Sequence, residues 1–200
     1  MKYNEMKQAV NLLANEWDLG KKEAGAEGNI CAWIYLMDLL EESEQIVTYK
    51  SGNKLIGFCG YSKQSSHKKI VKKKIYKIIG NILKKSKKIK NKDAINKHCN
   101  NYNYVPEELE NYFDGEVSIL IVDKNYRGKN IGKKLLFEIF EMAKKDNMKN
   151  LQILTDESCN YKFYEKCGCK KIYETIIENK EYGILGQITS EKAFIYEKTL

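Results

Sequence analysis

The residues of this sequence that are best suited to chemistry surround a strand, a glycine-containing turn and a helix, in that order. Glu116–Val122 is a β-branched run that opens on a carboxylate and is typical of a strand buried on both faces. From Ile131 onward apolar residues recur at helical spacing, and the turn before them holds Gly128. The first N–H groups of a helix have no partner within the helix and lie at the positive end of its dipole. We therefore expect an anion site at this helix start, where a phosphate is the usual ligand.

The spacing of the glycines excludes two common phosphate-binding loops. A P-loop requires the pattern G-x-x-x-x-G-K-[ST]. Here only three residues separate Gly128 from Gly132, and Lys134 stands where the hydroxyl residue should be. The dinucleotide-binding pattern G-x-G-x-x-G is also absent. The sequence therefore lacks the signatures of P-loop nucleotidases and of dinucleotide-binding domains.

This turn and a second stretch downstream together resemble motifs A and B of the GNAT acyltransferase superfamily. Arg127–Gly132 is similar to the R-G-K-G-I-G form of motif A, with Asn130 where the family has glycine. Phe163–Cys169 is similar to the motif B pattern F/L-Y-E-K-x-G-F, with a cysteine in place of the last aromatic residue. Asparagine tolerates left-handed backbone better than most residues, so we expect the turn to keep its shape. The resemblance covers residues 116–169, with the two motifs in the family's order and spacing.

The resemblance implies an α/β (α+β) fold of the GNAT type in a single domain over residues 1–200. It implies a mixed central sheet that is splayed between its fourth and fifth strands, with helices on both faces. The acetyl-CoA-binding core would span about residues 115–170, and a Lys-rich helical insertion would span about residues 63–103. The first 110 residues resemble the family only in topology, as two helices followed by a hairpin. A first strand would have to be very short, at residues 1–4.

The resemblance further implies that acetyl-CoA is the cosubstrate, that no metal is used, and that the acetyl group passes directly to an amine. An amine with a pKa near 10 is mostly protonated at neutral pH, so a base must remove a proton before attack. Glu116 is the expected base and Tyr164 the expected acid for the departing thiolate. The backbone N–H of Val122 is the expected donor to the thioester carbonyl.

The same resemblance implies which residues hold acetyl-CoA. The diphosphate would bind backbone N–H groups in the turn and first helical residues, with two basic side chains adding charge and an asparagine contacting the pantetheine arm. The expected acetyl-CoA contacts are Ile121, Val122, Arg127, Gly128, Lys129, Asn130, Ile131, Gly132, Lys133 and Asn160. Acceptor contacts would come from the first helices and the last strands, and the candidates are Trp17, Asp18, Glu23, Glu27 and Trp33.

The net charge of +8 belongs to one segment of the chain. Residues 45–92 hold 15 lysines and no acidic residue, whereas the remainder holds 20 basic and 27 acidic residues. Within this segment Ile75, Ile78 and Ile82 recur at helical spacing, so residues 68–90 are expected to form a basic amphipathic helix. Three roles stay open for it. It is a lid or buttress whose isoleucines pack on the domain, a dimer contact or substrate gate, or a surface for an anionic partner such as RNA or membrane headgroups.

Composition limits the remaining classes of protein. No apolar run approaches the roughly 18 residues of a membrane span, and the N-terminus lacks a signal-peptide pattern, so we expect a cytoplasmic protein. Six cysteines without a C-x-x-C pair and only two histidines argue against zinc and favour reduced thiols. Tyr76 is the one aromatic residue among the lysines of the basic helix, which argues against nucleic-acid binding. The alternative to an enzyme is a non-catalytic CoA-sensing or nucleic-acid-binding protein with a GNAT-like fold.

Overall fold

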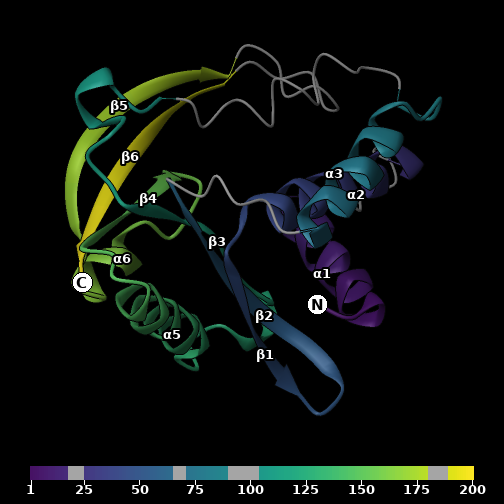
Figure 1. Ribbon diagram of the computed structural model, residues 1–200, viewed down its shortest axis with the longest axis horizontal. Coiled ribbons are helices and arrows are strands. Elements are labelled where there is room, and N and C mark those ends of the chain that lie inside the picture. Colours follow the sequence, from purple (N-terminus) through teal and green to yellow (C-terminus); the bar gives the residue numbers. More distant parts are fainter. Residues whose placement is uncertain (18–24, 65–70, 90–103, 180–188) are drawn as a thin grey trace.

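The computed structural model describes residues 1–17, 25–64, 71–89, 104–179 and 189–200. These residues form one six-stranded sheet in the order β1-β2-β3-β4-β6-β5, with helices on both faces (Figure 1). The strands are β1 (Gln45–Ser51), β2 (Lys54–Lys63), β3 (Gly115–Val122), β4 (Asn150–Asp156), β5 (Lys170–Asn179) and β6 (Thr189–Thr199). The α-helices are α1 (Tyr3–Glu16), α2 (Gly25–Glu42), α3 (Val71–Lys84), α5 (Ile131–Lys145) and α6 (Lys162–Lys166), and the 3₁₀ helices are η1 (Glu107–Leu109) and η2 (Lys124–Tyr126).

The sheet consists of two antiparallel halves that meet at a short parallel junction. β1, β2 and β3 pair in one half, and β4, β6 and β5 pair in the other. β3 and β4 pair only through Gly115 with Leu151 and Glu116 with Gln152, and beyond these residues the two strands separate (Figure 1). The expected splay is therefore present. It follows the third strand instead of the fourth, because α1 begins at Tyr3 and residues 1–4 form no strand.

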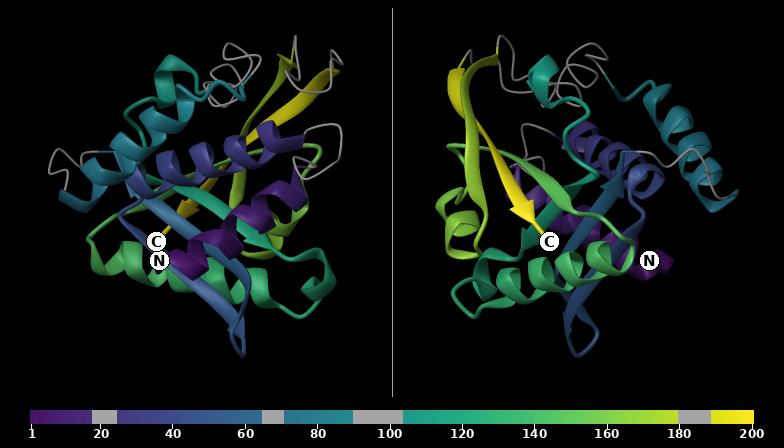
Figure 2. Two further views of the ribbon diagram at one scale, coloured as in Figure 1. Left: turned by 90° about the vertical axis from the view of Figure 1, so that its right-hand side faces the viewer. Right: turned by 60° about the vertical axis from the view of Figure 1, so that its left-hand side comes forward.

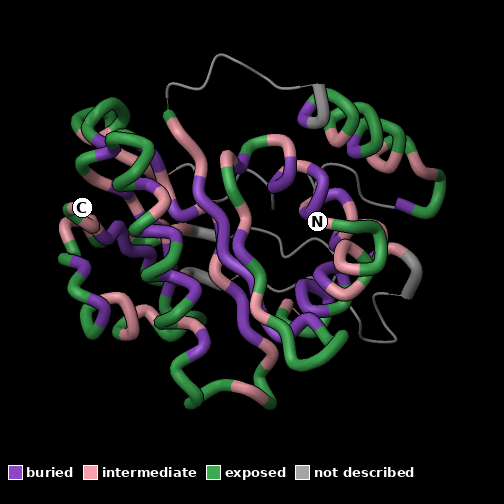
Figure 3. Tube along the Cα trace, turned by 60° about the horizontal axis from the view of Figure 1, so that its bottom comes forward, coloured by how far each residue is buried: buried purple, intermediate pink, exposed green. Residues whose placement is uncertain are grey.

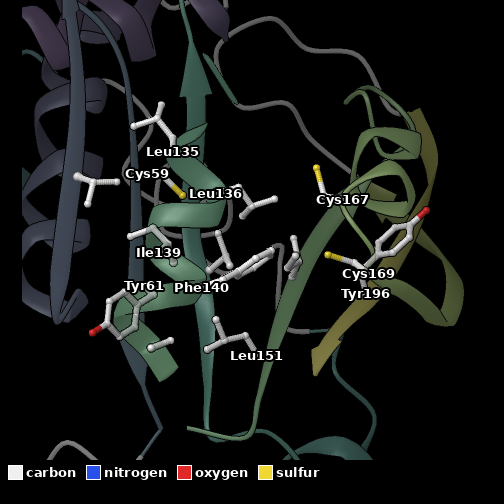
Figure 4. Packing of buried hydrophobic residues seen from close by; sticks show 14 of the residues in the cluster. Cys59, Tyr61, Leu135, Leu136, Ile139, Phe140, Leu151, Cys167, Cys169 and Tyr196 are labelled. Carbon is white, nitrogen blue, oxygen red and sulfur yellow. The ribbon is translucent and has the colours of Figure 1, made fainter. Parts of the chain in front are cut away.

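One apolar core lies between the sheet and α5. The buried face of α5 includes Leu136, Ile139 and Phe140. Figure 4 shows this face between Cys59 and Tyr61 of β2 on one side and the side chains of Cys167, Cys169 and Tyr196 on the other. Because α5 contacts both halves of the sheet in this way, its packing holds the two halves on either side of the gap.

A second apolar core lies on the opposite face, where α1 and α2 pack on β2 and β3. A β-bulge in β3 decides which residues of that strand face it. Gly60 pairs with Ile119 and Tyr61 pairs with Val117, so Ser118 has no partner of its own. Val117 consequently joins the core under α5, whereas Ile119 joins the core under α1 and α2. Glu116, one residue before Val117, faces the α1–α2 side.

α3 packs on the outer side of α2 and forms a third layer beyond the sheet (Figure 2). Of the three roles left open for this helix, the one in which its isoleucines pack on the domain is wrong, because Ile75, Ile78 and Ile82 are exposed. Instead Lys77 and Lys84 pair with α2, and Lys73 pairs with Glu44 just after α2. Of the insertion expected over residues 63–103, residues 65–70 and 90–103 lie outside the described part of the chain. None of the described helices is long and apolar enough to span a membrane.

Candidate active site

The gap between β3 and β4 exposes backbone donors along the free edge of β3. The N–H of Asp123 donates to the carbonyl of Ile56 on β2 over 2.8 Å. In an antiparallel ladder successive residues point alternately toward the partner strand and away from it. The N–H groups of Leu120 and Val122 therefore point away from β2, into the gap, where β4 no longer pairs with β3. Of these two residues, the sequence motifs indicate Val122 only, because the direction of an amide depends on the register with β2.

The turn that follows β3 has the backbone shape that its glycines and Asn130 were expected to allow. Gly128 has φ of +77° and Asn130 has φ of +60°, both in the left-handed region. The prediction that Asn130 keeps the turn in shape is confirmed. Among the described contacts the Asn130 side chain makes no capping bond, and the first bond of α5 runs from Lys134 N to Asn130 O over 3.0 Å. The N–H groups of residues 131–133 therefore leave the helix end without helical partners.

Gly132 lies where β3, α5 and α6 meet. A β-carbon placed on it would lie 3.5 Å from the Phe163 ring and 3.7 Å from a Val122 methyl group, which is ordinary van der Waals contact. The start of α5 is therefore adjacent both to the end of the gap-facing strand and to the helix that carries motif B. The structure brings the two motifs together although about thirty residues separate them in the sequence.

The residues expected to contact acetyl-CoA differ in whether their side chains or only their backbone groups are available to a ligand. The Arg127 side chain is bound within the protein. Its Nε donates to the Val122 carbonyl over 3.2 Å, and its guanidinium forms an ion pair with Glu16 of α1. Lys129 and Lys133 are exposed and lie over aromatic rings of their own turn and helix. The Ile121 and Ile131 side chains are buried in the two cores, so only their backbone groups are available at the site.

A polar pocket of about 250 Å³ lies next to this turn, between α1 and the end of β3. Its lining includes Asn11, Asn15 and Glu16 of α1 and Asp123 after β3. It lies on the α1 side of β3, away from the edge that faces β4. Val122, whose N–H faces the gap, also lines this pocket, as does Glu16, the ion-pair partner of Arg127.

Tyr164 on α6 approaches the gap from the α5 side. Its ring contacts Phe163 and Tyr196, and burial raises the pKa of its hydroxyl well above the ordinary value. The thiols that add to this pKa shift include Cys59 on β2 and Cys159 after β4, from the two halves of the sheet. No described residue hydrogen-bonds to the Tyr164 hydroxyl, which keeps its proton at neutral pH. Asn160 is exposed in the turn before α6, and its carbonyl accepts from the Phe163 N–H over 3.0 Å.

Glu116 lies at the closed end of the gap and faces the opposite side from Tyr164. It is partly buried, and its carboxylate accepts a hydrogen bond from Gln152 Nε2 over 2.8 Å. Tyr104 lies nearby, since the Glu116 charge is among the causes that raise the pKa of its hydroxyl, after burial. That hydroxyl donates toward the carbonyls of Thr155 (3.0 Å) and Phe194 (3.2 Å). No sequence motif marks Gln152 or Tyr104, and the structure alone places them beside Glu116.

Further carboxylates face the same side of the sheet as Glu116. Asp156 ends β4, is buried, and accepts from both Ser158 N and Ser158 Oγ. Glu191 on β6 follows the same face, and its pKa is raised by burial and by the charges of Asp156 and Glu157. Within the described ranges no group of three or more His, Cys, Asp or Glu side chains is arranged to hold a metal ion.

The acceptor candidates on the first helices are only partly described. Trp17 packs edge-on against Tyr35 at 4.6 Å between ring centroids, and Trp33 stacks on Tyr3 at 6.3 Å. Both tryptophans therefore have aromatic partners within the α1–α2 layer. Glu27 lies in the first turn of α2. Asp18 and Glu23 lie outside the described residues.

Comparison with known families agrees with this geometry. Residues 96–171 match the family model of the acetyltransferase (GNAT) domain. This part of the chain is therefore similar to a GNAT acetyltransferase domain. The match includes β3 and β4, which flank the gap, together with the turn, α5 and α6. No curated protein sequence matches the chain significantly.

Solved structures confirm the GNAT fold over nearly the whole chain. PH1933 from Pyrococcus horikoshii OT3 is 18% identical, with a TM-score of 0.61 over 100% of this chain and 93% of that chain. An aminoglycoside 6'-N-acetyltransferase complexed with coenzyme A is 14% identical, with a TM-score of 0.57 over 99% and 92%. An N-acetyltransferase from Staphylococcus aureus Mu50 is 14% identical, with a TM-score of 0.56 over 100% and 94%. At these identities the likeness establishes the fold.

Proposed function

We propose that this GNAT domain transfers the acetyl group of acetyl-CoA directly to an amine. The observation that carries the proposal is the free edge of β3, whose Leu120 and Val122 N–H groups face the gap and which leads into the uncapped start of α5. An extended amide-containing chain is the natural ligand of such an edge, and a phosphate is the natural ligand of such a helix start. The pantetheine diphosphate of acetyl-CoA contains both, and the aminoglycoside enzyme with this fold was solved with coenzyme A.

Acetyl-CoA would enter from the α5 end of the gap. Its diphosphate would accept hydrogen bonds from backbone N–H groups of residues 128–133, and its pantetheine arm would extend β3 along the free edge toward Glu116. The arm then meets Val122 first and Leu120 second. Of the two donors, Leu120 is nearer to Glu116, by four residues against six, so we assign its N–H to the thioester carbonyl and that of Val122 to the arm. Asn160 would contact the arm from the α6 side.

The transfer requires a hydrogen-bond donor to the thioester carbonyl, a base that takes a proton from the amine and an acid that protonates the departing sulfur. The amine nitrogen attacks the thioester carbonyl, forming the new C–N bond, and the oxyanion that develops accepts a hydrogen bond from Leu120 N–H. Glu116 takes the proton that the nitrogen must lose. Four residues of strand correspond to about 13 Å, so this proton moves through water. The C–S bond then breaks, and Tyr164 supplies a proton to the departing sulfur, which its raised pKa allows because the hydroxyl is protonated at neutral pH.

The charge around the gap supports a cationic acceptor. Glu116, Asp156 and Glu191 lie on the same face of the sheet, and burial together with the Asp156 and Glu157 charges disfavours ionisation of Glu191. An ammonium group bound beside these carboxylates would relieve their mutual repulsion. An acceptor with more than one amine would make this contact while presenting a second, neutral amine to the thioester.

Amine-dependent release of CoA tests the proposal. We expect the wild-type protein to release CoA from acetyl-CoA with at least one member of a panel of di- and polyamines, aminoglycosides, amino acids and peptides. Glu116→Gln should lower kcat by about 100-fold or more, and Tyr164→Phe by about 10-fold or more, because each removes one proton-transfer group. Both variants should bind acetyl-CoA within a few-fold of wild type. Tyr173→Phe, on β5, is the matched control for Tyr164→Phe and should leave kcat unchanged.

Two outcomes would overturn the proposal. If acetyl-CoA binds but no amine in the panel is acetylated, the protein is a CoA sensor with this fold. If Glu116→Gln and Tyr164→Phe both keep wild-type kcat, transfer occurs but these residues do not perform it.

A further inference from the structure

The amphipathic helix α3 faces the domain with a row of lysines, beside which Tyr76 and Leu83 pack on the α1–α2 core. Lys73 pairs with Glu44 at 2.9 Å, Lys77 with Glu41 at 3.6 Å, and Lys84 with Asp38 at 2.9 Å. Lys73 is 7% exposed, which is unusual for a lysine. Residues at i, i+4 and i+11 lie on one face of a helix, so these lysines form a single row that pairs with acidic side chains of α2 and of the turn after it.

The isoleucines of α3 consequently face away from the domain. Ile75, Ile78, Ile79 and Ile82 are 50%, 58%, 39% and 64% exposed, and their i, i+3, i+4, i+7 spacing makes one continuous stripe. α3 stands on the outside of the molecule, beyond α2 (Figures 2 and 3). Isolated exposed apolar residues are ordinary, whereas a contiguous stripe of four on one helix marks an interaction surface.

Positive charge borders this isoleucine stripe. Lys74 and Lys85 are exposed and lie along one edge of it, since Lys74 precedes Ile78 by four residues and Lys85 follows Ile82 by three. Lys87 and Lys88 add exposed charge just beyond the helix. No acidic residue occurs anywhere in residues 45–92, so none on α3 or its flanking segments offsets these lysines.

We propose that the isoleucine stripe of α3 docks on an anionic lipid bilayer. A helix that presents an apolar stripe with lysines at its margin lies flat in the bilayer interface, with the apolar side chains below the headgroups and the lysines among the anionic phosphates. The same charge disfavours a second copy of this chain, because two stripes in contact would bring two lysine-rich margins together. A nucleic acid would use the lysines but would leave the isoleucines in water. The proposal is independent of the acetyl-transfer activity.

Co-sedimentation of the full-length chain with lipid vesicles tests this docking surface. The vesicles are phosphatidylcholine alone, or phosphatidylcholine with about one third phosphatidylglycerol. We expect the wild-type protein to bind the anionic vesicles at least about 10-fold more strongly than the neutral ones. Ile78→Ser/Ile82→Ser should reduce anionic binding to the neutral level, and Lys74→Gln/Lys85→Gln should reduce it several-fold. Ile176→Ser is the matched control, because Ile176 is 66% exposed on β5, and it should bind like wild type.

These substitutions should not affect folding, because they change exposed side chains. Thermal unfolding should show the same midpoint for Ile78→Ser/Ile82→Ser and wild type. The proposal is overturned if wild type binds both vesicle types equally or not at all, or if the isoleucine variant binds like wild type. It is also overturned if sedimentation equilibrium shows a wild-type dimer that the isoleucine variant dissociates, or if RNA is bound in place of vesicles.

Discussion

α5 and α3 are both amphipathic helices with lysines and isoleucines, yet they contact the domain through opposite faces. α5 buries Leu135, Leu136 and Ile139 in the core between the two halves of the sheet and leaves its lysines in water. α3 places its lysines against α2 and leaves its isoleucines in water. Periodicity therefore predicts that a helix forms and that it has two faces, but the surface it meets decides which face is buried.

The surfaces that the two helices meet explain the difference. α5 lies against strands whose facing residues are apolar, including Val117 and Leu151. α3 lies against an α2 edge that carries acidic side chains, and Gly80 lets the two helices approach closely. A β-carbon at Gly80 would lie 3.3 Å from Asp38 Oδ1 and 3.4 Å from Met37 Cβ. A glycine inside a helix lowers helix stability by about 1 kcal/mol relative to alanine. At Gly80 the missing β-carbon allows α3 to pack closely on α2.

The largest expected difference in the free energy of unfolding is between alanine substitutions of isoleucines in the two helices. Ile139 in α5 is 0% exposed, so Ile139→Ala should lower the free energy of unfolding by about 2–5 kcal/mol through lost burial and a cavity. Ile82 in α3 is 64% exposed, so Ile82→Ala should change it by no more than about 0.5 kcal/mol. Urea unfolding of the two variants measures the contrast. Equal losses would mean that the isoleucine stripe of α3 is covered by protein after all.

A smaller difference in the free energy of unfolding is expected between substitutions of two neighbouring lysines of α3. Lys73→Gln leaves the Glu44 carboxylate without its ammonium partner in a half-buried contact, so we expect a loss of about 1–3 kcal/mol. Lys74→Gln changes an exposed side chain and should be nearly neutral. The readout is urea unfolding at low and high salt, and if Lys73→Gln is as mild as Lys74→Gln, the ion pairs do not hold α3 in place.

The turn before α5 allows a still smaller test. Asn130 has φ of +60°, where a residue with a β-carbon and no local hydrogen-bonding group is strained by about 1–2 kcal/mol. Asn130→Ala should therefore lower stability by about 1 kcal/mol, whereas Asn130→Gly, which restores the residue common in the family, should be neutral or slightly stabilising. Thermal unfolding of both variants decides. A more stable Asn130→Ala would contradict the left-handed turn.

Alkaline pH should lower the free energy of unfolding through tyrosines buried in the core under α5, whereas at neutral pH these tyrosines should have no effect on it. Burial raises the pKa values of Tyr61, Tyr164 and Tyr196 above the value of about 10 expected in the unfolded chain. Above that pH the unfolded chain releases protons that the folded protein keeps, so the free energy of unfolding falls as pH rises. Urea unfolding across the alkaline range should show this slope, and Tyr196→Phe should reduce it. If Tyr196→Phe leaves the pH dependence of the free energy of unfolding unchanged, groups other than Tyr196 cause it.

The sequence predicted the elements whose signals are local. The β-branched run of β3, the period of α5 and the two motifs were enough for the fold and for the left-handed turn before α5, because each depends on residues close in the chain. The positions of Leu120, Gln152 and Tyr104 beside the gap were not predicted, because they depend on strand register and on contacts between distant segments. The orientation of α3 was misjudged for the same reason, since the acidic edge that binds it belongs to α2.

The central claim is that acetyl-CoA binds at the start of α5, and one titration tests it. Gly132→Asp adds a negative charge there, while an acidic residue in the first turn favours the helix and the β-carbon meets only ordinary contacts. By calorimetric titration with acetyl-CoA we predict a Kd at least about 100-fold weaker for Gly132→Asp, because the carboxylate repels the diphosphate. Gly132→Ala, which adds the β-carbon without the charge, should stay within a few-fold of wild type. A wild-type Kd for a folded Gly132→Asp would contradict the claim.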